Sequence, residues 1–139
     1  MMQKDRPHAA LRGALLALLV AAVSACGGGL PEEAPPTIIS VTLRGGADMN
    51  PGRDGSARPA TVRVMQLRSS DDFLESDFFA LDADPAAALG QDLIDEERFM
   101  LTPGAVQVYQ REMAANARFI GVLASLRDVE AAQWRAIAR

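Results

Sequence analysis

The sequence predicts a mainly β protein, an antiparallel β-sandwich that carries one short helical insertion. Segments with strand periodicity, which are apolar on one face or on both, recur between residues 37 and 138. A stretch rich in Gly and Pro separates the first two of these segments. The one stretch with helical periodicity lies between the second segment and the third. This arrangement of strands, loop and insertion favours a single sandwich domain over residues 37–139.

The N-terminus has the features of an export signal. A basic start precedes an uncharged apolar run over residues 13–23. That run is too short to span a membrane, which takes about 20 residues, and small residues follow it. Cys26 comes directly after Ser24 and Ala25, a pattern that resembles the lipobox of bacterial lipoproteins. The resemblance implies a signal peptide over residues 1–25 and lipidation of Cys26; an ordinary signal and an uncleaved anchor are the alternatives.

Residues 26–36 are rich in Gly, Pro and Glu and predict a flexible linker behind the lipidated cysteine. The lipobox resemblance implies acyl chains such as palmitate on Cys26, a covalent lipid where other proteins carry a cofactor. Gly27 stands where lipoproteins retained in the inner membrane usually have Asp. The resemblance therefore implies the outer membrane, with the domain on its periplasmic face.

The first two strands are predicted on either side of a long loop. Residues 37–43 and 61–67 both alternate, and the second segment places Val62 and Val64 on one face and Met65 and Leu67 on the other. The intervening residues 44–60 contain Gly, Pro and Asn-Pro without any period. Loops longer than about 12–15 residues are uncommon in compact domains and are often functional.

Residues 70–97 predict a helical insertion of one to three short helices. Leu74, Phe78 and Leu81 form an apolar stripe at helical spacing, and Asp84-Pro85 is typical of a helix start. We expect the phenylalanines here to plug one end of the sandwich core, with a ligand pocket as the alternative.

The remaining strands follow the insertion. Residues 98–101 lead into the turn 102–104, and residues 105–113 alternate. Residues 117–126 are apolar on both faces and predict a central strand. Residues 133–138 predict a last strand, with Trp134 in the core.

Composition excludes several classes of chemistry. The only Lys, His and Cys are Lys4, His8 and Cys26, so a chain cut before Cys26 has no His, no Lys and no second Cys. This excludes His-based acid–base catalysis, Schiff-base chemistry, an internal disulfide, and any Cys or His metal site. The chain has a net charge of −4 and 5% aromatic residues, which argues against a nucleic-acid partner.

Carboxylates are the remaining groups that could support catalysis. The candidates cluster at predicted helix starts and loops, where capping and solvation explain them: Asp71, Asp72, Asp92, Asp95, Glu96 and Glu97. We therefore expect no enzyme activity, no catalytic residues, no metal and no cofactor. The alternative function is a periplasmic lipoprotein that binds a hydrophobic ligand or another envelope protein.

The order and spacing of several segments resemble the TssJ/SciN (VasD-type) outer-membrane lipoprotein family of the type VI secretion system. The segments that carry the resemblance behind the lipobox are Asn50-Pro51, Gly55, Pro59, 62–67, Phe73, Asp77-Phe78, Leu81, Leu89-Gly90, Asp92, 101–104, 117–122, Ala124, 126–128 and Trp134-Arg135. The resemblance implies a transthyretin-like β-sandwich with a small helical addition and a non-catalytic role. It also implies binding to the C-terminal periplasmic domain of TssM, and through TssM an indirect link to TssL.

The same resemblance implies that the loop over residues 44–60 contacts TssM. The candidate contact residues are Met49, Asn50, Arg53, Asp54 and Arg58. Asn50 has a second interpretation, as a residue that only shapes a turn.

Arg63 is expected to be a structural ion-pair partner on the sheet surface. Arg127 is expected to pair with Asp128 and close a turn, with a second contact patch for the partner as the alternative. The chain departs from the family pattern at Met65, where Tyr is common. It also ends soon after Trp134-Arg135, where family members usually continue, so we expect a truncated C-terminal end or a sheet that is short by an edge.

Overall fold

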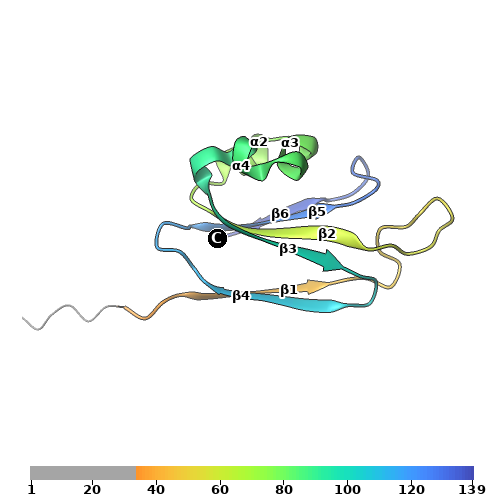
Figure 1. Ribbon diagram of the computed structural model, residues 1–139, viewed down its shortest axis with the longest axis horizontal. Helices are drawn as coiled ribbons and strands as arrows, with labels where there is room; N and C mark the ends of the chain where they lie inside the picture. The colour runs from red at the N-terminus through yellow and green to blue at the C-terminus, as the bar shows by residue number, and fades with distance from the viewer. Residues whose placement is uncertain (1–33) are drawn as a thin grey trace, which may run out of the picture. The chain divides into compact units, whose positions relative to one another are not determined.

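In residues 34–139, which the structure describes, six strands form two antiparallel sheets that face each other (Figure 1). The smaller sheet pairs β1 (Ile38–Arg44) with β4 (Val106–Glu112). The larger sheet has the order β3 (Leu93–Leu101), β2 (Ala60–Leu67), β5 (Phe119–Ser125) and β6 (Arg135–Ala138). The predicted antiparallel sandwich is confirmed, and β5 is a central strand as its apolar faces indicate.

The computed structural model describes residues 34–139, and the unit considered below is Pro36–Arg139. The predicted signal peptide, Cys26 and linker residues 27–33 lie outside the described residues. Within residues 34–139, no helix combines the length and the apolar character needed to cross a membrane.

The core between the two sheets is built on one face of β2. Val62 and Val64 are buried there with Leu101 of β3, and they pack against Leu43 and Tyr109 of the smaller sheet. Because side chains alternate along a strand, these residues lie on one face of each strand. The alternation predicted for Val62 and Val64 is therefore confirmed.

The opposite face of β2 is equally apolar, and the helices cover it. Met65 and Leu67 are fully buried there. They pack against Phe73 of α2 (Asp71–Glu75), Leu81 of α3 (Phe78–Ala83) and Leu89 of α4 (Pro85–Leu89). The expectation that the phenylalanines plug one end of the sandwich is wrong. A strand with two apolar faces needs a layer on each side, and Figure 1 shows the helices as a third layer over the larger sheet.

The helical insertion is shorter than the predicted residues 70–97. It ends with the 3₁₀ turn η1 (Gly90–Asp92), and β3 begins at Leu93. The predicted insertion includes Asp95 to Glu97, but the structure places these residues in β3. Arg63 of β2 pairs with Glu96, and Arg111 of the smaller sheet pairs with Glu97, so β3 tolerates these carboxylates.

Caps rather than a continuous stripe define the helices. Asp77 and Asp84 accept hydrogen bonds from the third backbone N–H after them and thereby cap α3 and α4. Leu74 and Phe79 are exposed, because the chain turns between α2 and α3 and breaks the predicted stripe.

Candidate functional site

The loop between β1 and β2 folds back on itself through its own backbone. Arg58 N donates to Met49 O at 3.1 Å, Gly52 N donates to Ser56 O at 2.8 Å, and Gly55 N donates to Gly52 O at 3.0 Å. Figure 1 shows the loop projecting beyond the ends of the strands. A stretch without periodicity thus forms an ordered projection.

Asn50 holds this projection to a second loop. Its backbone has φ +46°, a left-handed conformation that Asn adopts more readily than most residues. Its side-chain Nδ2 donates to Pro59 O at 2.8 Å, and its Oδ1 accepts from Arg127 N at 2.8 Å. The amide therefore ties both sides of the β1–β2 loop to the loop that follows β5.

Asp54 and Arg58 pair at the end of the projection, with 3.2 Å between Oδ2 and Nη2. The hydroxyl and backbone N–H of Ser56 also donate to Asp54, and these bonds hold the pKa of its carboxyl below the usual value. Gly52 makes room for the pair, since a Cβ there would lie 2.5 Å from Arg58 Nε and 2.6 Å from Asp54 Oδ1.

The five predicted contact residues thus divide into two groups. Met49 packs against the core between the sheets, and Asn50 is engaged in bonds within the protein. Arg53, Asp54 and Arg58 are exposed on the projection. Among the described residues, Arg53 forms no ion pair.

The loop between β5 and β6 lies beside the projection. Asp128 Oδ1 accepts from Ala131 N at 3.3 Å, and no ion pair joins Arg127 to Asp128 in the described chain, so that expected pair is wrong. The backbone N–H of Arg127 is committed to Asn50, and its side chain is exposed.

A cleft of about 260 Å³ opens where the two loops meet. Its lining consists of Asn50, Pro51, Leu126, Arg127, Asp128 and Ala132. Sequence reasoning missed Leu126 and Ala132, because nothing in the local pattern indicates that two distant loops meet.

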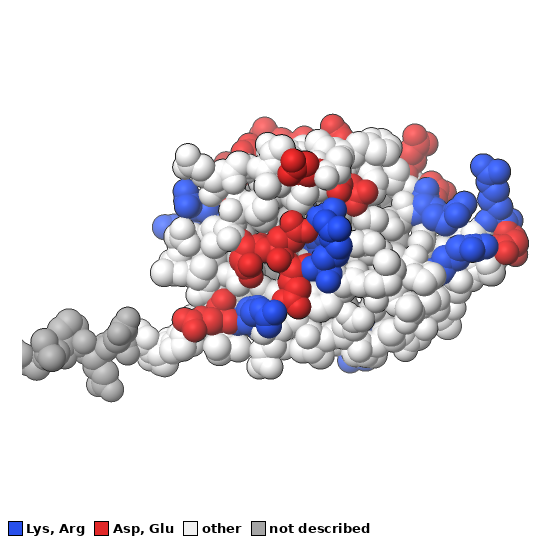
Figure 2. Space-filling view, viewed as in Figure 1, with Lys and Arg blue, Asp and Glu red and all other residues white. Residues whose placement is uncertain are grey.

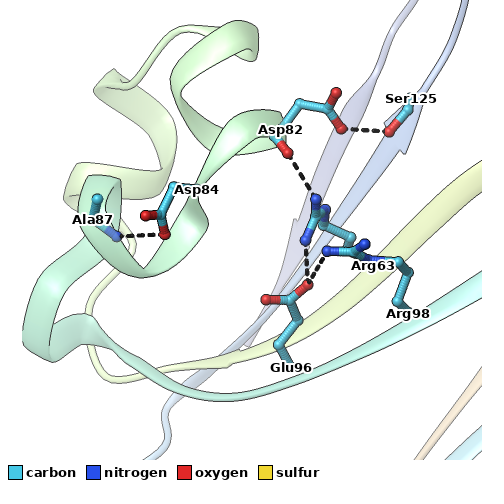
Figure 3. A network of polar contacts seen from close by, with 7 residues as sticks. All are labelled: Arg63, Asp82, Asp84, Ala87, Glu96, Arg98 and Ser125. Atoms are coloured by element: carbon cyan, nitrogen blue, oxygen red, sulfur yellow. Dashed lines mark hydrogen bonds and ion pairs between the residues drawn. The ribbon is translucent and has the colours of Figure 1, made fainter.

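Arg63 holds the helical insertion to the sheet (Figure 3). It is 5% exposed, forms an ion pair with Glu96 and donates from Nη2 to Asp82 O at 2.7 Å. The Asp82 carboxylate accepts in turn from Ser125 Oγ at 2.6 Å. The predicted ion pair is confirmed, but it lies beneath the helices rather than on the sheet surface.

Arg135 makes a similar connection to α2. Its Nη1 donates to Phe73 O and Ser76 O, each at 2.9 Å, and its guanidinium lies 4.6 Å from the centre of the Trp134 ring. Trp134 is half-buried and meets the edge of Phe78, with ring centroids 5.3 Å apart. It borders the layer of helices instead of lying deep in the core.

The carboxylates considered for catalysis do not converge. Asp71 and Asp72 lie in the first turn of α2, Glu96 pairs with Arg63, and Glu97 pairs with Arg111 at 2.6 Å. No group of three or more metal-binding side chains is found among residues 34–139.

A second cleft, of about 420 Å³, lies between β1 and β6 and is mainly apolar. Its lining includes Ile39, Val41, Ile120, Val122 and Ile137. It offers no converging polar groups that could orient a reaction.

Residues 37–139 match a family model described as "Type VI secretion lipoprotein, VasD, EvfM, TssJ". No curated protein matches the sequence.

Several solved structures are similar to this chain. The T6SS lipoprotein TssJ1 from Pseudomonas aeruginosa is 32% identical, with a TM-score of 0.71 over 74% of this chain and 79% of that chain. Serratia marcescens Lip, described as a membrane bound component of the Type VI Secretion System, is 32% identical, with a TM-score of 0.70 over 74% of each chain. A structure described as the TssM C-terminal domain from EAEC is 23% identical, with a TM-score of 0.64 over 73% of this chain and 78% of that chain, and it shows the fold alone.

Proposed function

Because the chain belongs to the type VI secretion lipoprotein family, we propose that it anchors a type VI secretion membrane complex to the outer membrane. It does so by binding the C-terminal periplasmic domain of TssM. The family is a non-enzymatic component of this machinery, and the chain is not an enzyme. The domain's work is to hold a partner.

The observation that carries this proposal is the ordered projection between β1 and β2. Its internal backbone bonds and the Asp54–Arg58 pair fix its shape before any partner arrives. A preformed loop loses less conformational entropy on binding than a flexible one. Arg53 and Arg58 present guanidinium groups, which are favoured at interfaces because they form bidentate bonds with carboxylates.

The anchor in this proposal is Cys26, which carries the acyl chains after residues 1–25 are removed. More than one acyl chain gives stable attachment, because a single chain binds a membrane only marginally. Residues 26–36 then tether the sandwich domain, 37–139, on the periplasmic face of the outer membrane. TssL joins only indirectly, through TssM.

The test measures binding of the full lipidated chain, in detergent, to the TssM C-terminal periplasmic domain. In one variant, two glycines replace residues 52–56. The bonds from Arg58 N to Met49 O and from Asn50 to Pro59 O remain possible in this variant, so the frame of the loop is kept. We expect its affinity to fall at least about 10-fold, the loss of a hot spot.

A matched pair of exposed arginines gives the control. Arg53→Ala should weaken binding, whereas Arg98→Ala, which removes an exposed arginine of β3, should leave it unchanged. Equal thermal unfolding of all variants shows that they are folded. An unchanged affinity of the folded loop variant would refute the proposal.

A further inference from the structure

We propose that the loop between β5 and β6, residues 126–134, forms the second half of the partner site. The cleft between this loop and the β1–β2 loop takes a large apolar side chain of the partner, and Arg127 receives a partner carboxylate beside it. This inference rests on the proposed function and adds to it both a second loop and the chemistry of the partner's contact.

The first observation is the pair of hydrogen bonds that the Asn50 side chain makes. One side-chain amide bridges Pro59 O and Arg127 N, two groups that belong to different loops. Both bonds measure 2.8 Å, within the usual range for N–H···O. The two loops therefore present one surface of fixed relative geometry, and a partner that contacts the projection meets the neighbouring loop as well.

The second observation is the cleft. Pro51, Leu126 and Ala132 supply an apolar lining, and the volume of about 260 Å³ accommodates a side chain the size of Leu or Phe. Hot spots of protein interfaces are typically large side chains that fill a pocket on the partner. The small size of Ala132 keeps the cleft open.

The third observation is charge. The chain as a whole is acidic, with a net charge of −4, yet the Arg127 side chain at the cleft is exposed and forms no ion pair among the described residues. The neighbouring Asp128 carboxylate is engaged by Ala131 N at 3.3 Å. Figure 2 shows basic side chains at the end of the domain where the β1–β2 loop projects, whereas many acidic ones lie over the helices and β3. A partner carboxylate complements Arg127.

The decisive experiment fills the cleft. In the full lipidated chain, Ala132→Trp should weaken binding of the TssM C-terminal periplasmic domain at least about 10-fold. The matched control is Ala86→Trp, which places the same ring on an exposed residue of α4, outside both loops. Its affinity should equal that of the unchanged chain.

Two further variants test the frame and the charge. Asn50→Gly permits the positive φ but removes both side-chain bonds, and we expect weaker binding without loss of the fold. Arg127→Glu keeps its backbone N–H for Asn50 and should weaken binding more at low salt than at high salt.

The outcomes separate the two proposals. If the replacement of residues 52–56 abolishes binding while Ala132→Trp and Arg127→Glu bind like the unchanged chain, the two-loop site is overturned and the proposed function stands. If the unchanged chain does not bind the TssM domain, both are overturned. Loss of binding in both Ala132→Trp and the loop variant, but not in Ala86→Trp, supports both.

Discussion

Two arginines explain how a set of very short helices stays in place. Arg63 and Arg135 both donate to backbone carbonyls of the insertion, at Asp82 near the end of α3 and at Phe73 and Ser76 around the end of α2. The last carbonyls of a helix lack partners within the helix and carry partial negative charge. A guanidinium donates to these carbonyls and thereby ties the helix to the strand that carries the arginine.

Removal of Arg63 gives a prediction at this scale. Arg63→Ala should lower the free energy of unfolding by about 3 kcal/mol, because it leaves Glu96 and Asp82 O without their buried partner. Arg98→Ala is the control, since Arg98 also approaches Glu96, at 3.9 Å, but is exposed; its cost should be about 0–1 kcal/mol. Urea unfolding measures both, and equal losses would contradict the buried role of Arg63.

We expect the stability of the domain to depend on pH in the alkaline range because of Tyr109. Burial raises the pKa of its hydroxyl above 10.0. The unfolded chain then releases this proton at lower pH than the native chain, so stability should fall as the pH rises through about 10. Tyr109 is the only Tyr, so its tyrosinate absorbance reports the titration directly.

The control for that titration is Tyr109→Phe. It removes an acceptor of Gln66 Nε2, which lies 3.1 Å away, and should cost about 1 kcal/mol at neutral pH. It should also abolish the loss of stability near pH 10. A slope that persists in this variant would assign the effect to other groups.

At the scale of elements, the insertion depends on packing. Helices as short as α2, α3 and α4 are marginal by themselves, so their stability comes from the face that they bury. Phe73, Leu81 and Leu89 provide that face over the larger sheet. Gly121 of β5 leaves space for it, because a Cβ there would lie 3.0 Å from Leu67 Cδ1 and 3.1 Å from the Phe73 ring.

Gly121→Ala should therefore cost about 1–3 kcal/mol, the usual penalty for overpacking a core. Phe73 and Leu67 are fully buried, so a shift of either side chain would disturb its packing. Phe73→Leu creates space, so the double variant should lose less stability than the two single losses combined. Additive losses in urea unfolding would show that the ring and the new methyl group do not meet.

Local patterns predicted the strands well and the insertion partly. Alternation is a property of neighbouring residues, so β1, β2 and β5 could be read from the sequence. The start of β3 could not, because Glu96 and Glu97 are stabilised in a strand by Arg63 and Arg111, which are distant in sequence. The layer of helices was missed although the apolar second face of β2 required a cover.

The candidate site could likewise be predicted only where the signal lies in neighbouring residues. The projection could be predicted, because its length and its Gly and Pro residues mark a loop locally. Its junction with Leu126 and Ala132 could not, since it depends on Asn50 meeting Arg127 across 77 residues. Asn50 shapes its loop through hydrogen bonds within the protein, in line with its second interpretation. Direct contact of Asn50 with a partner stays a prediction.

At the scale of the whole molecule, the proposed function joins a lipid anchor and a partner site in one chain. Cys26→Ser should release the protein from the outer membrane, because the acyl chains supply the attachment. Gly27→Asp should instead redirect the lipidated protein to the inner membrane. Membrane fractionation measures both, and a Cys26→Ser protein that still sediments with outer membranes would disprove the anchor.

The hydrogen bond from Arg127 N to Asn50 has a consequence for how this lipoprotein diverges. It uses a backbone group, which every residue except proline supplies, so the side chain at position 127 can change without loosening the frame. In the proposed two-loop site, single substitutions around the cleft can thus change partner preference while the geometry of the loops is kept. Insertions between Asn50 and Pro59 that displace the amide would remove that freedom, since they would separate the two loops.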